Sequence, residues 1–320
     1  LKNKKNIKIK FSNLNFKLGK KNIFSIKDIN LDNFDKKKLD LNGFFLKKEI
    51  KINYKTAKEK NIFLVLIPEA GTELKIFFNN SNYLYGMVKS KILNSNIKFN
   101  FDNKRKDQIK IDSSYFRSKS LNATYDSKII LKPNFFFETN LNIKNVDIKH
   151  IYDLYKEKLL SKNNLKIKIN KKINGILDIS YYPKKIDLNK IKNLNTKIKI
   201  ENGNIFFKNL LLNYDNLNLS LNGSLISKDD NQKLIFYIDH SIEKKNKTFK
   251  KKYNYLKLKI SGILNLNLKK IQFIKFSVDD KEKSLREIEI LEKTFNTISK
   301  NNLLNILNIK NIKQFTKSIN

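Results

Sequence analysis

The carboxylates that could do acid–base or metal chemistry are scattered along the chain. Glu69 stands in a Pro-Glu-Ala-Gly sequence, which is typical of a tight turn. Two acidic pairs, Asp229-Asp230 and Asp279-Asp280, are each followed by polar residues. A calcium ion needs several more oxygen ligands at loop spacing than either pair supplies. We therefore expect the turn and the two pairs to be structural and solvated, and we predict no metal site.

The candidates for nucleophilic or general-base catalysis are equally few. The chain has no Cys and only two His, His150 and His240. No second His lies close to either one in the sequence, so neither supports general acid–base chemistry. The sequence also lacks a Gly-rich phosphate loop, a paired-His motif and a nucleophile elbow. These observations predict a protein that is not an enzyme and needs no cofactor.

The charge is large but poorly suited to nucleic-acid recognition. Lys and Arg together number 67 against 30 Asp and Glu, so the net charge is +37. Only Arg105, Arg117 and Arg286 are Arg, the residue preferred for bidentate phosphate and guanine contacts. Lys, Asn and Ile all have AT-rich codons, so codon drift in an AT-rich genome accounts for much of the charge. Nucleic-acid binding remains an alternative that the composition disfavours.

Alternation of apolar and polar residues with a period of two is the main structural signal, and it predicts strands with one apolar face. It is clearest over 256–268, where Leu256, Leu258, Ile260, Leu264, Leu266 and Leu268 share one face. Such amphipathic strands are typical of antiparallel sheets. We therefore predict a mainly β fold, a long curved antiparallel sheet that closes as a barrel, folds over as a sandwich or forms an open hydrophobic groove. An ordinary sandwich or irregular β core is the plainer alternative.

Two segments show helical spacing instead. Residues 146–161 predict one short helix lying on the sheet, and residues 281–320 predict a helical C-terminal tail. In the tail, Leu285, Ile288 and Leu291 begin one apolar face. We divide the chain into a β-groove domain over 1–280 and the helical tail over 281–320. The longest apolar run, 62–67, is far too short to span a bilayer as a helix.

Several segments resemble the AsmA-like family of bridge-like lipid-transfer proteins, which includes TamB. The segment KPNFFFETNLNIKNVDIKHIYDLY resembles that family's strand-then-short-helix unit. LNTKIKIENGNIFFKNLLLNYDNLNLSLNGSLIS resembles the family's C-terminal signature, with Gly203 in its turn and Gly223 at its end. The similarity extends over about four fifths of the chain and consists of alternation plus Gly.

The resemblance implies a non-enzymatic module that binds or transfers phospholipid or another acyl lipid in the bacterial cell envelope. It implies a periplasmic location, with an inner-membrane anchor expected upstream of Leu1, and leaves an outer-membrane assembly factor as the alternative. The predicted groove residues are the apolar halves of the strands: Ile167, Ile169, Leu177, Ile179, Ile198, Ile200, Leu217, Leu219, Leu221, Leu256, Leu258, Ile260, Leu264 and Leu266.

Overall fold

Strands dominate the structure, a computed structural model, and the prediction of a mainly β chain is confirmed. The structure describes residues 9–18, 21–35, 37–57, 60–80, 83–92, 94–105, 107–147, 169–183, 191–214, 217–228, 231–244 and 254–299. They belong to two compact units, Leu1–Lys132 and Pro133–Asn320. The predicted division at residue 280 separates β from helical segments, and it stays a prediction.

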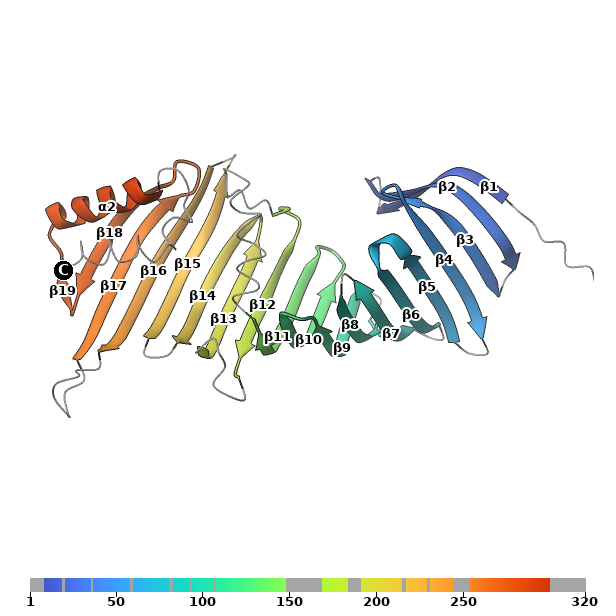
Figure 1. The fold of residues 1–320 in the computed structure, drawn as a ribbon, viewed down its shortest axis with the longest axis horizontal. Coiled ribbons are helices and arrows are strands. Elements are labelled where there is room, and N and C mark those ends of the chain that lie inside the picture. Colours follow the sequence, from blue (N-terminus) through green and yellow to red (C-terminus); the bar gives the residue numbers. More distant parts are fainter. Residues whose placement is uncertain are drawn as a thin grey trace, which may run out of the picture. The chain divides into compact units, whose positions relative to one another are not determined.

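The first unit is an open, curved antiparallel meander in which each strand pairs with the next (Figure 1). A single 3-10 turn, η1 (Pro68–Ala70), joins two of its strands and ends at Gly71, whose φ of 56° is left-handed. The strands are β1 (Ile9–Leu18), β2 (Lys21–Asp35), β3 (Lys38–Phe45), β4 (Lys48–Ala57), β5 (Lys60–Ile67), β6 (Thr72–Asn80), β7 (Leu84–Ile92), β8 (Ser95–Asp102), β9 (Gln108–Arg117) and β10 (Leu121–Ile130).

The second unit departs from a pure meander at its first pair of strands, which run parallel. A parallel pair needs a crossover of a dozen or more residues, and residues 147–173 separate these two strands. The predicted helix over 146–161 belongs to that crossover and, apart from Val146 and Asp147, lies outside the described residues. The strands are β11 (Phe136–Val146), β12 (Asn174–Tyr181), β13 (Ile191–Glu201), β14 (Asn204–Tyr214), β15 (Leu217–Lys228), β16 (Asn231–Lys244), β17 (Asn254–Asn265), β18 (Lys270–Val278) and β19 (Lys281–Glu282).

From β12 to β18 the strand register places apolar residues opposite apolar residues. Residues paired across neighbouring strands share a face of the sheet. One row runs through Ile200, Ile205, Leu225, Leu234, Leu264 and Ile271. On the other face, Asp178 pairs with Lys197, and Asp239 pairs with Lys259. This unit therefore has one apolar and one mainly polar face, as the alternation predicts.

A second row on the apolar face alternates Phe with Gly. It contains Phe207, Gly223, Phe236, Gly262 and Phe273, one residue from each of β14 to β18. A Cβ on Gly262 would stand 2.6 Å from the carbonyl oxygen of Gln272 and 3.0 Å from the ring of Phe236. The first unit repeats the arrangement where Gly86 lies between Phe78 and Phe101. At these positions the chain requires Gly because a neighbouring strand or ring occupies the space of a side chain.

Helix α2 (Leu285–Ser299) packs on the end of the apolar face and also protects the outer edge of β18. Glu292 Oε1 accepts a hydrogen bond from the Phe273 amide at 2.6 Å, and Asn296 Oδ1 accepts one from the Ile271 amide at 2.8 Å. The Ser299 hydroxyl donates to the Lys269 carbonyl at 2.9 Å. These side chains lie on one side of the helix and satisfy backbone groups that another strand would otherwise pair with.

The start of α2 has a capping box. The Ser284 amide donates to Glu287 Oε2 at 2.8 Å, and the Glu287 amide donates to Ser284 Oγ at 3.4 Å. Hydrogen bonds from Ser284, first that of its backbone, together with Lys283, lower the pKa of Glu287 to about 2. The prediction that Leu285 begins the apolar face of this helix is wrong, because Leu285 is 81% exposed. The cap places the buried face one turn later, at Ile288 and Leu291.

We expect a Gly262→Ala variant to lose roughly 1–3 kcal/mol of unfolding free energy, because the added methyl group forces the backbones of β17 and β18 apart. The urea midpoint of unfolding measures this loss. Ser261→Ala is the matched control, since Ser261 is the preceding residue and faces the other side of the sheet. Equal midpoints for the two variants would contradict the close packing at Gly262.

Candidate functional site

The apolar face of the second unit brings most of the predicted groove residues together. Leu177 pairs with Ile198, and Ile179 lies two residues further along β12. In β15, Leu219 and Leu221 face His240 and Ile238 of β16, which in turn face Leu258 and Ile260 of β17. The residues with a described side chain on this face are Leu177, Ile179, Ile198, Ile200, Leu219, Leu221, Leu258, Ile260 and Leu264.

The remaining predicted residues are placed less fully. Leu217 and Leu256 both pair with Ile242, so their backbones continue the same row, while their side chains lie outside the described set. Ile169 precedes β12, and Leu266 follows β17, where its amide donates to the Gln232 carbonyl at 2.9 Å. Ile167 lies outside the described residues.

The predicted residues on this face fall into two environments. Leu221, Leu258, Ile260 and Leu264 pack against a buried cluster that includes Phe273, Phe276 and Phe295. Leu177, Ile179, Ile198, Ile200 and Leu219 are not members of that cluster. Both groups are partly buried, so the two differ in their contact with the buried Phe cluster and not in their class of solvent exposure. Tyr181, on the same face of β12, is 1% exposed, so burial varies along the strand.

His240 is the polar exception within these apolar rows. It lies between Leu219 and Leu258 in the register, and its buried Nδ1 has no hydrogen-bond partner. Burial lowers the pKa of His240, against opposing effects of a hydrogen bond with the Asn218 backbone and of the Asp239 charge. The neutral imidazole is thus the form that this face favours. The sequence showed His240 beside an apolar strand but not its orientation toward the apolar side.

The acidic residues considered for catalysis that the structure describes lie in a turn, a hydrogen bond or ion pairs. Glu69 is exposed in η1, as the turn prediction required. The Asp279 carboxylate accepts the Lys257 amide at 2.8 Å, and Asp280 forms ion pairs with Lys257 at 3.6 Å and Lys259 at 2.7 Å. The hydrogen bond and charge of Lys259 lower the pKa of Asp280. Asp229, Asp230 and His150 lie outside the described residues.

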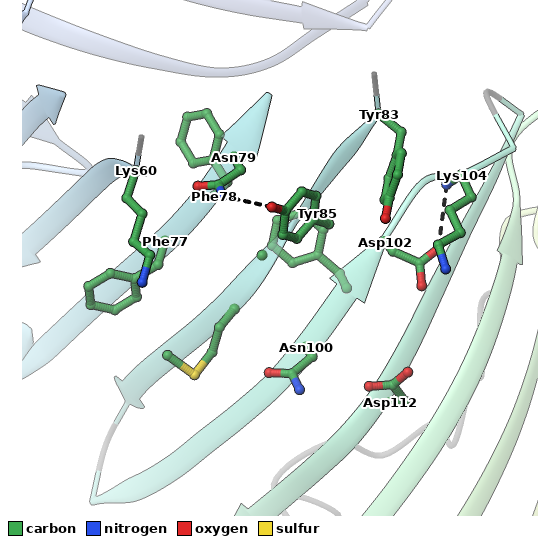
Figure 2. Close-up of a pocket in the computed structure, with 13 residues that line it drawn as sticks. Lys60, Phe77, Phe78, Asn79, Tyr83, Tyr85, Asn100, Asp102, Lys104 and Asp112 are labelled. Carbon is green, nitrogen blue, oxygen red and sulfur yellow. Dashed lines mark hydrogen bonds between the residues drawn. The ribbon is translucent and has the colours of Figure 1, made fainter. Parts of the chain in front are cut away.

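The first unit contains a cavity of about 460 Å³ that the sequence analysis missed (Figure 2). Its lining comes from β5 to β9 and includes Phe77, Tyr85 and Asn100. These side chains lie on the face opposite Phe78 and Phe101, as their register shows. Aromatic and amide residues at these positions interrupt a Lys-rich pattern, but this interruption alone does not show that the side chains line one cavity.

Comparison with known proteins finds no family model, curated protein or solved structure that matches this chain. Within the described part of the chain, no helix combines the length and apolarity needed to cross a bilayer. The same residues contain no group of three or more His, Asp or Glu arranged to hold a metal ion.

The position of His240 predicts a pH dependence of stability. A folded-state pKa below the unfolded value means that the unfolded chain binds more protons, so stability falls as the pH drops through about 6.5. We expect a His240→Leu variant to lose less stability between about pH 7 and pH 5 than the unmodified protein. Urea midpoints measured across this range test the expectation. His150→Gln, which changes the only other His, should keep the original slope; an unchanged slope in His240→Leu would contradict it.

Proposed function

We propose that this protein is a non-enzymatic module that binds or transfers phospholipid or another acyl lipid in the bacterial cell envelope, in the periplasm. The observation that carries the proposal is the continuity of apolar rows across β12 to β18 on a single face of the sheet. Each methylene of an acyl chain that leaves water on such a surface contributes about 0.8 kcal/mol. A chain of ordinary length therefore gains enough to bind without any directed polar contact.

We assign the acyl chains to the group that lies outside the buried Phe cluster. Ile198, Ile200 and Leu219 retain solvent contact, so a ligand there removes apolar surface from water. The residues that pack against the Phe cluster are also partly buried, but they already contact buried protein side chains.

A second candidate function is a structural or assembly factor of the outer membrane, which uses the sheet as a scaffold. The buried cluster around Phe276 and Leu291, each 1% exposed, favours this role because it makes the end of the sheet a rigid core. Nucleic-acid binding is a weaker candidate, since several Lys of the polar face are paired with acids, such as Lys38 with Asp40 at 2.8 Å and Lys199 with Glu201 at 2.9 Å.

We expect the gently purified protein to carry phospholipid in native mass spectrometry and to crosslink to a photoactivatable phosphatidylethanolamine. Leu219→Glu should reduce the crosslinked fraction about tenfold, because a carboxylate on the apolar face opposes acyl-chain burial. Ser220→Glu is the matched control on the opposite face, and both residues are partly buried. The control should crosslink like the unmodified protein.

Two results would contradict the proposal. One is a protein mass free of lipid together with no crosslinking. The other is equal crosslinking by Leu219→Glu and Ser220→Glu. A Leu258→Glu variant distinguishes a packing role from lipid binding. Leu258 packs against the buried Phe cluster, so this substitution should lower the unfolding temperature.

A further inference from the structure

The cavity of the first unit is a site in its own right, independent of the proposed lipid function. It lies where β5 begins, β6 ends, β7 begins and β8 ends, and Phe78, Gly86 and Phe101 contribute to its lining (Figure 2). Its volume of about 460 Å³ falls within the range of small-molecule sites.

One wall of the cavity is aromatic. The rings of Tyr83 and Tyr85 have centroids 5.3 Å apart and are tilted by 42° to each other. Asn79 Nδ2 donates to the Tyr85 hydroxyl at 2.8 Å, which fixes the orientation of that ring. Tyr85 is 38% exposed, so part of its surface is available to a ligand. A tyrosine face presents a weakly negative apolar surface to C–H groups.

The rest of the lining combines hydrogen-bond donors and acceptors at one place. Met87 pairs with Asn100, and Asn100 pairs with Asp112, so all three belong to one row on this face. Asp102 pairs with Tyr85 in the neighbouring row. The amide of Asn100 both donates and accepts, and the two carboxylates accept. Such a set matches a ligand with several hydroxyl groups.

The charged residues of the lining favour neither an anionic nor a cationic ligand. Asp102 and Asp112 repel an anion, although Lys60 and Lys104 also line the cavity. A cation would seek the aromatic faces, but the Lys104 ammonium already lies 5.7 Å from the Tyr83 ring centroid, and Lys89 lies 5.9 Å from that of Phe77. With two acids and two lysines, the lining has no net charge, which favours a neutral ligand.

We propose that this cavity is a binding site for a neutral saccharide. The sugar ring places its C–H face on Tyr85, and its hydroxyl groups exchange hydrogen bonds with Asn100 and with the carboxylates of Asp102 and Asp112. A cavity volume of about 460 Å³ has room for about one or two sugar units.

Saturation-transfer NMR and calorimetric titration of the full chain test the site with maltotriose, cellotriose and chitotriose, and with choline and inorganic phosphate as charged probes. We expect at least one trisaccharide to bind with a millimolar or lower Kd. Tyr85→Ala should weaken it about tenfold or more, and Asn100→Leu, which keeps the side-chain shape, should do the same. Tyr237→Ala, at a tyrosine that is 44% exposed on β16, is the matched control and should bind normally.

Three results would overturn the proposal: no binding of any trisaccharide, unchanged binding in both variants, or tighter binding of choline or phosphate than of the sugars. Unfolding temperatures accompany each titration. If Tyr85→Ala is unstable, Asn100→Leu decides the outcome alone. Lipid crosslinking should be unaffected in both variants, so failure of this site and failure of the lipid proposal are separate results.

Discussion

Cross-strand register is the constraint on which the rest of the structure depends. A strand whose apolar residues recur every second position has one apolar face, and a shift of one residue would turn that face to the other side. From β12 to β18 the registers keep these faces aligned, so that Leu177, Ile198 and Phe207 lie in one row. The register shifts within the β13–β14 pair leave apolar residues paired on both sides of a bulge, as in Ile198 with Phe207 and Leu194 with Leu212.

Glycines within the strands and helix α2 control the packing and the exposed edge of the apolar face. Gly223 and Gly262 alternate with Phe in one row and allow close approach of neighbouring backbones. Helix α2 packs against β18 and hydrogen-bonds the outer edge of that strand through Glu292 and Asn296. An exposed strand edge is a template for pairing with another chain, and the helix protects this one.

Sequence periodicity predicted the strands and their apolar faces because alternation is a local property of the chain. It also predicted a helix near Ile288, although the capping by Ser284 and the exposure of Leu285 escaped it. The parallel pairing of β11 with β12 and the cavity around Tyr85 depend on which strands become neighbours, and no local pattern encodes that choice. The packing of Leu258 against the buried Phe cluster was missed for the same reason.

The central claim is that acyl chains bind on the apolar face of this sheet. A nitroxide scan along 218–224 of β15, read by electron paramagnetic resonance with oxygen and a water-soluble nickel complex, tests it most directly. With phospholipid bound, Leu219 should become accessible to oxygen and protected from nickel, while Asn218 and Ser220 stay accessible to nickel. Two results would contradict lipid binding on this face. One is an oxygen and nickel accessibility that does not alternate along β15, and the other is an accessibility at position 219 that lipid does not change.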